Sequence, residues 1–293
     1  MTAPRHPLGI GAALVRRAAL VAGLALAIGG VGGGARRAAA GTMSFASPAS
    51  VTMVNNGPSA ERIDIVILSD GYTAAEMATF AADAQAVIDQ IMAYPPYAVH
   101  APFVNIHRVN VISAESGTDD PANGIARDTA LDTSFGIGGT DRCLFFGTAE
   151  GFNNAASAAA MAPDADGVIL VTVNSGKYGG CAAPPYAVAS AVAPATHPHE
   201  LGHAFALLAD EYDDRPGCHP ATEPSAANVT VNAMASKWSL WLPEAGVGAF
   251  VGADHYPSCA YRPQANCLMR TLNVPLCRVC GEQITKRFYG NQE

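Results

Sequence analysis

A short segment near residue 200 holds the residue types that hydrolytic chemistry needs, in the order His199-Glu200-Leu201-Gly202-His203. On a helix, residues four apart lie on one face, so both imidazoles can reach one metal ion. The glutamate between them points to an adjacent position, where it can take a proton from water at that ion. The segment therefore predicts one catalytic Zn2+ ion, with His199 and His203 as ligands and Glu200 as the general base.

A catalytic zinc ion needs a third protein ligand and an open position for water. Asp210 and Glu211 follow His203 by seven and eight residues, too far for a continuous helix to bring either one back to the ion. If the helix ends near residues 207–209, the chain can turn and present a carboxylate. We expect Asp210 to be the third ligand and keep Glu211 as the alternative; the other carboxylate would accept a hydrogen bond nearby.

Several side chains elsewhere in the chain could complete such a site. Met269 lies in a turn that contains Pro and Asn, where it can lie beneath the metal or simply fill the core. Candidates for contact with an oxyanion or with substrate are Tyr178, Tyr212, Tyr261 and Arg270. Asp70 and Tyr72, after the first predicted strand, either border the cleft or only stabilise a turn.

The elements that must position these residues alternate between strands and helices. Apolar, largely β-branched runs predict strands at residues 62–68, 103–112, 167–173 and, at an edge of the sheet, 186–192. Thr73 and Glu76 form a capping box that begins a helix, and the helix ends before Pro95. Residues 117–139, rich in Gly, Asp and Thr, indicate a long surface loop. Strands that alternate with helices predict an α/β fold.

The N-terminal segment has the features of an export signal. Residues 1–40 hold five arginines and no acidic residue, and they enclose an apolar run at 18–31 that is too short to span a bilayer. With small residues at 38–40, this is typical of a cleaved signal peptide, so we predict a secreted or periplasmic protein. The pairs Arg16-Arg17 and Arg36-Arg37 leave twin-arginine export and an uncleaved membrane anchor as alternatives.

The cysteines fit an exported protein. They all lie beyond residue 140, at Cys143, Cys181, Cys218, Cys259, Cys267, Cys277 and Cys280. Three disulfides and one free thiol would account for seven. Cys277 and Cys280 have the spacing of half a zinc knuckle or of a redox pair, but no second such pair is nearby. We therefore expect disulfides, and an irregular, disulfide-rich C-terminal part after Pro216.

Composition excludes several classes of function. With 17 basic and 25 acidic residues and a formal charge of −8, the chain is a poor match to a sequence-independent nucleic-acid binder. Beyond the leader no stretch reaches 18 apolar residues, so we expect no membrane span in the mature chain. We also expect the protein to be a monomer. GxSxG, P-loop and dinucleotide motifs are absent. Residues 164–167 (DADG) hold part of a calcium loop without its remaining ligands, so structural Ca2+ is unsupported.

Four segments resemble the IgA peptidase family of zinc metallopeptidases. They are residues 62–76, the Lys177-Tyr178-Gly179-Gly180 loop, residues 199–212 (HELGHAFALLADEY) and residues 261–270. The resemblance spans roughly residues 60–290 and implies an α/β, metzincin-like zincin catalytic domain with a mixed sheet, an active-site helix, one zinc ion and endopeptidase action. It implies His199 and His203 as ligands, Glu200 as base and Met269 as the Met-turn residue. The metzincin pattern HExxHxxGxxH is not kept, since Ala206 and Ala209 occupy its last two marked positions.

The sequence thus predicts a signal peptide at residues 1–40, a lead-in at 41–60 and a zinc peptidase domain at 61–293, with lobes that meet near residue 209. The predicted activity is hydrolysis of a protein or peptide substrate by water at zinc, with Glu200 as general base. One alternative is a non-catalytic secreted protein that binds peptides or glycans, but such a protein would not need Glu200. Another is a zinc amidase that acts on cell-wall material, because HExxH does not distinguish between amides.

Overall fold

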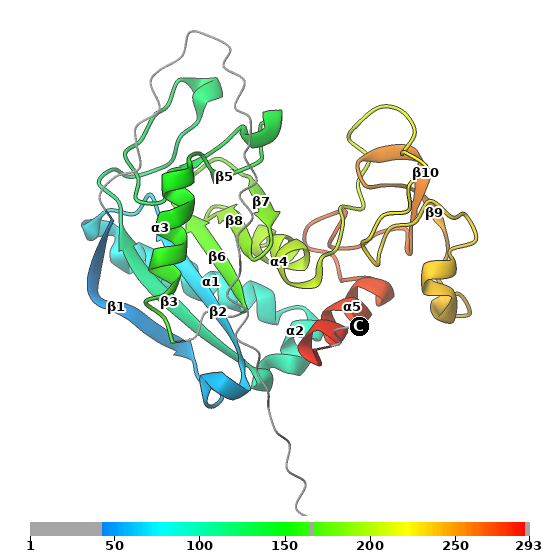
Figure 1. The fold of residues 1–293 in the computed structure, drawn as a ribbon, viewed down its shortest axis with the longest axis horizontal. Coiled ribbons are helices and arrows are strands. Elements are labelled where there is room, and N and C mark those ends of the chain that lie inside the picture. Colours follow the sequence, from blue (N-terminus) through cyan, green and yellow to red (C-terminus); the bar gives the residue numbers. More distant parts are fainter. Residues whose placement is uncertain (1–42, 164–166, 291–293) are drawn as a thin grey trace, which may run out of the picture. The chain divides into compact units, whose positions relative to one another are not determined.

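The computed structural model describes residues 43–163 and 167–290 (Figure 1). The predicted signal peptide and residues 164–166 of the calcium-like motif lie outside these ranges. Within the described chain, six strands form one sheet in the order β1-β3-β2-β6-β8-β7. The strands are β1 (Ser44–Val54), β2 (Ile63–Asp70), β3 (Val104–Ile112), β6 (Val168–Val173), β7 (Gly180–Ala183) and β8 (Tyr186–Ser190).

The sheet is mixed, as predicted. Its four inner strands run parallel, whereas β1 and β7 pair antiparallel at the two edges. Strands β2 and β6 are apolar at most positions because both of their faces are covered. Side chains of β2 alternate between two cores, with Ile65 and Ile67 in one and Val66 and Leu68 in the other. The three central strands predicted from the sequence are confirmed.

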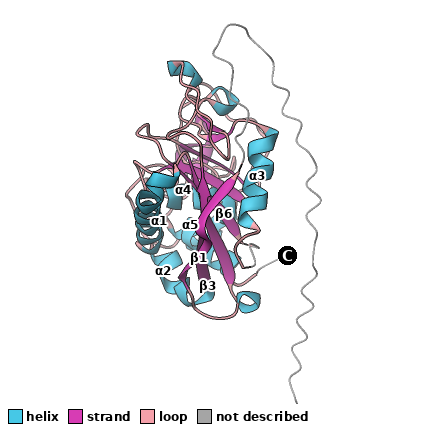
Figure 2. Cartoon of the chain, turned by 90° about the vertical axis from the view of Figure 1, so that its left-hand side faces the viewer, coloured by secondary structure: helices cyan, strands magenta, loops and turns pink. Residues whose placement is uncertain are grey.

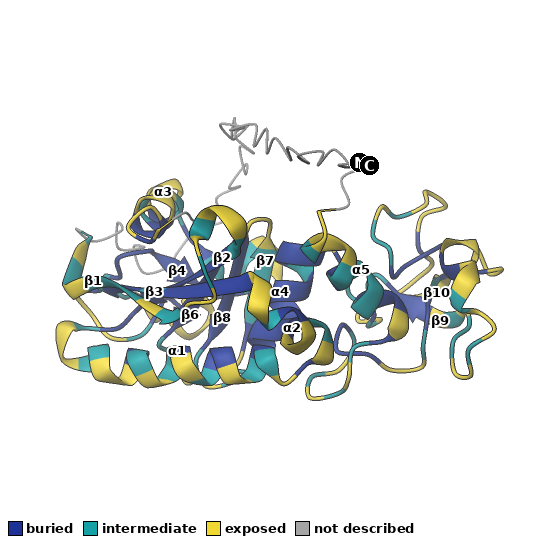
Figure 3. Cartoon of the chain, turned by 90° about the horizontal axis from the view of Figure 1, so that it is seen from below, coloured by how far each residue is buried: buried dark blue, intermediate teal, exposed yellow. Residues whose placement is uncertain are grey.

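Helices cover both faces of the sheet. The face of Ile65 contacts α1 (Met77–Met92), α2 (Pro95–His100), α4 (Thr196–Ala206) and α5 (Arg278–Phe288), and the opposite face contacts α3 (Ala149–Ala159). Figure 2 shows α1 and α3 on opposite sides of the strands. In Figure 3 the strands are buried, and the outer side of α1 is exposed. The buried residues of α1 recur every three or four positions, so one face of the helix packs on the sheet. These layers confirm the α/β prediction.

The segment after β3 packs against the end of β2 more tightly than the sequence indicated. The buried carboxylate of Asp70 accepts hydrogen bonds from the hydroxyls of Thr129 and Thr133 and from the N–H of Leu131. The prediction of a surface loop at residues 117–139 is therefore wrong for residues 129–135, which are buried and satisfy this carboxylate, whereas residues 121–125 are exposed.

The start of α1 follows the sequence prediction. The N–H of Thr73 donates to Glu76 at 2.8 Å, which confirms the capping box. One residue earlier, the Tyr72 hydroxyl donates to Asp83 at 2.7 Å, and Tyr72 itself is fully buried. Tyr72 and Asp70 therefore stabilise the turn, and neither lines the cleft described below.

The sequence analysis missed one edge strand and placed another strand wrongly. The lead-in contains β1, which pairs with β3 at one edge of the sheet. The strand predicted at an edge, β8, lies between β6 and β7. The true edge strand is β7, whose four residues include Gly180 and lack the β-branched side chains by which strands are recognised.

The C-terminal part is less irregular, and has fewer disulfides, than predicted. It contains a small sheet of β9 (Phe250–Ala253) with β10 (Tyr256–Arg262), and another two-stranded sheet, of β4 (Thr133–Ser134) with β5 (Phe145–Phe146), lies earlier in the chain. The structure has two disulfides, Cys143–Cys181 and Cys218–Cys259, so only one lies after Pro216. The prediction of three bridges is wrong because Cys267, Cys277 and Cys280 remain free. No helix in the described ranges is long and apolar enough to cross a membrane.

Candidate active site

Helix α4 ends at the point that the third-ligand argument requires. Leu207 adopts a left-handed backbone (φ 56°, ψ 35°), and its N–H donates to the carbonyl of His203 at 3.1 Å. A left-handed residue at a helix C-terminus changes the direction of the chain. The following residues therefore return past the helix, and Asp210 reaches the face that bears His199 and His203.

Three ligand-type atoms form a nearly equilateral triangle there. His199 Nε2 and His203 Nε2 are 3.1 Å apart, and Asp210 Oδ1 lies 3.1 and 3.2 Å from them. His199 Nδ1 donates to the carbonyl of Leu268 at 3.0 Å, and His203 Nδ1 to that of Leu208 at 2.7 Å. Because a carbonyl only accepts, each Nδ1 carries a hydrogen, and in the neutral ring each Nε2 presents its lone pair to the centre of the triangle.

The electrostatics of this triangle favour a positive charge. Asp210 Oδ1 is buried and accepts no hydrogen bond. Burial would raise the pKa of Asp210, but the two imidazoles outweigh burial and lower it. Burial lowers the pKa of His203, but the carboxylate of Asp210 outweighs burial and raises it to about 9. The three groups therefore stabilise a proton or a metal ion between them.

Glu200 lies beside the triangle, in the wall of a cleft of about 570 Å³. Its side chain is almost entirely buried, and burial raises its pKa above the ordinary value for a glutamate. The backbone of Gly180 in β7 lies so close that a Cβ added there would be 2.6 Å from Glu200 Oε1. The backbone of the edge strand thus packs directly against the Glu200 carboxylate, and only glycine leaves room for this contact.

The four candidate contact residues divide into two groups. Tyr178, Tyr212 and Arg270 line the same cleft as His199 and Glu200. Tyr261 lies on β10, exchanges backbone hydrogen bonds with Thr230 and does not line the cleft, so the structure does not bring it to the site.

Tyr212 and Arg270 already have partners inside the protein. The Tyr212 hydroxyl makes a hydrogen bond with Asp210, and burial followed by the Asp210 charge raises its pKa. Arg270 donates to the carbonyl of Glu211 at 2.7 Å and to Asp213 at 3.1 Å. Arg270 therefore holds the segment that contains Asp210, whereas Tyr212 contacts Asp210 directly.

Glu211 and Met269 lie on the other side of this segment. The Glu211 carboxylate contacts Asn228, Cys277 and Cys280, while the two histidines contact Asp210. Met269 is fully buried under α4, where a Cβ added to Gly202 would lie 2.7 Å from its sulfur.

One residue at the site was missed by the sequence analysis. His255, in the turn between β9 and β10, lies with Nε2 3.5 Å from Asp210 Oδ2 and with Nδ1 2.8 Å from Asp214. It is separated from the HExxH segment by about fifty residues of chain without a motif, so no local pattern indicates its position. Its ring packs edge-on against Tyr212 at 5.0 Å.

The close approach of Gly180 leads to a prediction. We expect Gly180→Ala to lower kcat/KM about 100-fold, because a displacement of a reacting group by roughly 1 Å has an effect of this size. Metal binding at the triangle should be unchanged, since the added Cβ would meet Glu200 and Thr196 and none of the three triangle residues. Gly176→Ala is the matched control, because its added Cβ would meet no atom within 4 Å. Full activity in Gly180→Ala would show that the strand does not position Glu200.

The fold and the cleft together define an α/β protein of the HExxH class. The sequence model of one protein family, described as IgA Peptidase M64, matches residues 51–246 and 242–288. The chain belongs to this family and is a peptidase, which confirms the family resemblance. A search of curated proteins finds no match.

Proposed function

We propose that this protein is a secreted, zinc-dependent endopeptidase in which Glu200 is the general base. The observation that supports this most directly is the triangle of His199 Nε2, His203 Nε2 and Asp210 Oδ1, with Glu200 beside it in one cleft. Family membership accounts for the peptidase activity. The proposal adds that the peptidase uses zinc, that His199, His203 and Asp210 bind it, and that Glu200 is the base.

The residues fit a zinc ion. Ligand bonds of 2.0–2.1 Å at tetrahedral angles separate ligand atoms by about 3.3 Å, close to the 3.1 and 3.2 Å observed. Two neutral imidazoles and a carboxylate are a donor set typical of catalytic zinc, and the unpartnered Asp210 Oδ1 would gain a partner. When bound, zinc polarises a carbonyl and lowers the pKa of water to about 7. His199, His203 and Asp210 would hold it.

The proton route follows from the position of Glu200. Its carboxylate takes a proton from the attacking water while the water oxygen forms a bond to the peptide carbonyl carbon. The same carboxyl group then donates this proton to the amide nitrogen as the C–N bond breaks. A raised pKa suits both steps, because a buried carboxylate accepts and releases a proton closer to neutral pH.

Substrate would lie in the same cleft. Tyr212 is the best-placed donor to a developing oxyanion, because its hydroxyl already reaches Asp210 at the triangle. Tyr178 is partly exposed and packs under the guanidinium of Arg142 at 5.2 Å, so we assign it to substrate contact rather than to the reaction. The disulfide Cys143–Cys181 lies in the cleft wall and fixes its shape.

Export is supported by the disulfides. Cys143–Cys181 and Cys218–Cys259 would persist in an oxidising environment outside the cytoplasm. The predicted signal peptide agrees with this location.

The test is a digest of a denatured proteome by the purified mature chain. We expect new internal cleavages that stop when a chelator removes zinc and return when zinc is added back. Zinc binding without any cleavage would favour a non-catalytic binding protein. Cleavage of peptidoglycan fragments without cleavage of proteins would favour a cell-wall amidase. Digestion that continues in chelator at full rate would contradict the role of the metal.

A further inference from the structure

A second cluster of ligand-type side chains lies beside the candidate active site and has no role in the proposed hydrolysis. Cys267, Cys277, Cys280 and Glu211 are all buried, and one ligand atom from each lies within 4.8 Å of the others. We propose that these four side chains bind a second zinc ion, which stabilises the protein and does not contact substrate. This proposal concerns a separate site and does not depend on the proposed peptidase mechanism.

The spacing of the donor atoms suits tetrahedral zinc. Glu211 Oε1 lies 3.3 Å from Cys280 Sγ and 3.9 Å from Cys277 Sγ. Zinc bonds of about 2.3 Å to sulfur and 2.0 Å to oxygen would separate such atoms by about 3.5 Å. Thiolate ligands favour zinc over calcium or magnesium, which prefer oxygen.

The backbone prepares the sulfurs to be thiolates. The N–H of Cys277 donates to Cys267 Sγ at 3.2 Å, and the N–H of Cys280 donates to Cys277 Sγ at 3.3 Å. Cys277 also caps the N-terminus of α5, where the helix dipole favours negative charge. Hydrogen bonds to sulfur and a positive helix end both stabilise the charged form that binds metal.

Glu211 supplies an independent reason to expect a cation. Its side chain is 0% exposed, and although Oε1 accepts a hydrogen bond from Asn228 at 3.0 Å, Oε2 is buried and accepts none. A buried carboxylate oxygen without a partner is unfavourable, and a cation held by the neighbouring thiolates would supply one.

A disulfide is a weaker explanation of the three cysteines. A bond between any two of them would leave the third thiol and the Glu211 carboxylate buried together, whereas a metal ion uses all four groups. The four other cysteines of the chain are paired in the two disulfides, so none is left to form a disulfide with the third thiol. The cluster therefore has the composition of a closed structural site with three Cys and one Glu.

Such an ion would fix two segments of the active site. Glu211 directly follows Asp210, and Cys267 directly precedes Leu268, whose carbonyl accepts the hydrogen bond from His199. The N–H of Glu211 also donates to the carbonyl of Met269 at 2.7 Å. We expect the second zinc to hold these segments together.

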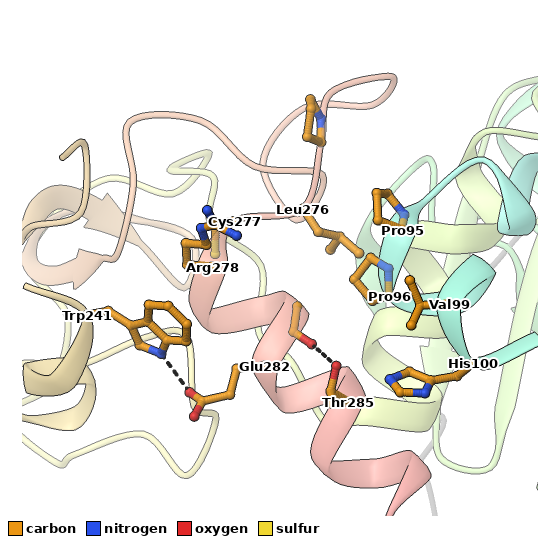
Figure 4. A pocket seen from close by; sticks show the side chains of 12 residues that line it. Pro95, Pro96, Val99, His100, Trp241, Leu276, Cys277, Arg278, Glu282 and Thr285 are labelled. Carbon is orange, nitrogen blue, oxygen red and sulfur yellow. Dashed lines mark hydrogen bonds between the residues drawn. The ribbon is translucent and has the colours of Figure 1, made fainter. Parts of the chain in front are cut away.

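The cluster borders an opening through which a metal or a reagent can approach. Cys277 lies in the wall of a pocket of about 460 Å³ between α2 and α5. Figure 4 shows Cys277 at the first turn of α5, above the Trp241 ring that donates a hydrogen bond to Glu282. A mercurial that binds thiolates should therefore reach this site from one side.

The test counts zinc in a chain whose histidine site has been removed. In the full chain with His199→Ala and His203→Ala, we expect one zinc ion per molecule, and X-ray absorption should show three sulfur neighbours at about 2.3 Å. Adding Cys280→Ser to this variant should weaken zinc binding at least about 100-fold, because loss of a ligand exceeds the 10–100-fold effect of an outer partner. Cys143→Ser with Cys181→Ser is the control and should keep the ion.

A second measurement uses the unaltered chain, in case the variants do not fold. Titration with p-hydroxymercuribenzoate should release one zinc ion as three thiols react. The proposal is overturned if the double histidine variant folds without zinc, or if its zinc has only nitrogen and oxygen neighbours. It is also overturned if the denatured, unreduced chain has a single alkylatable thiol, because a disulfide would then account for the other two cysteines.

Discussion

Glu200→Gln is expected to lower kcat/KM by about 100- to 10,000-fold while zinc remains bound, because the amide cannot take a proton from water. The substitution keeps the size of the side chain, so the contact with Gly180 is preserved. Peptide cleavage and zinc content are measured on the same sample. The expected result is a protein with its metal and without its activity.

The control for this variant is Glu150→Gln, on the exposed first turn of α3, which should retain full activity. If Glu200→Gln cleaves peptides at the rate of the unaltered protein, another group is the base and the proposed mechanism is wrong. If it loses zinc as well, Glu200 is a ligand instead of a base.

Asp210→Asn is expected to weaken zinc binding at the histidine site at least about 100-fold, with a parallel loss of activity. A neutral amide oxygen replaces the charged Oδ1 that lies 3.1 and 3.2 Å from the two imidazoles. Outer partners of a ligand are worth 10–100-fold in affinity, so a direct ligand is worth at least as much. The effect is measured by titrating zinc into protein from which a chelator has removed the metal. The same titration of the variant with both histidines replaced identifies which binding step belongs to this site.

Asp213→Asn provides the matched comparison, because Asp213 lies three residues further on and pairs with Arg270. It should leave zinc affinity unchanged. If Asp210→Asn also leaves it unchanged, the third ligand lies elsewhere and Glu211 becomes the candidate again. The contacts of Glu211 with two thiols make the first outcome the expected one.

The parts of the fold that could be predicted are those with local patterns. Strands β2 and β6 contain continuous apolar runs, β3 alternates apolar with polar residues, and α1 begins at a capping box, so short windows of sequence identify them. Helix α3 was not predicted, because its alanines and asparagines lack a clear apolar period, although Thr148 caps it. The order of β8 and β7 depends on how strands pair, which no local window contains.

The candidate site divides in the same way. His199, Glu200 and His203 are recognisable because one helical turn sets their spacing, and the preference for Asp210 followed from where that helix had to end. His255 and the cluster of Glu211 with three cysteines come from segments far apart in the chain, and the folded chain alone brings them together. The Cys-x-x-Cys pair was noticed, but its neighbours in the fold lie ten or more residues away in the sequence. Without them the pair was interpreted as part of a disulfide framework, which is wrong.

The hydrogen bond from His199 to the carbonyl of Leu268 also has a consequence for biosynthesis. A chain is made from its N-terminus, so the HExxH helix exists long before the Met269 turn and α5 are available to it. Until those later segments have folded, His199 lacks the acceptor that orients its ring and Asp210 lacks the neighbours that hold it. A nascent chain, or one truncated before Leu268, would thus have the HExxH helix without the contacts that orient its first histidine and its acidic neighbour.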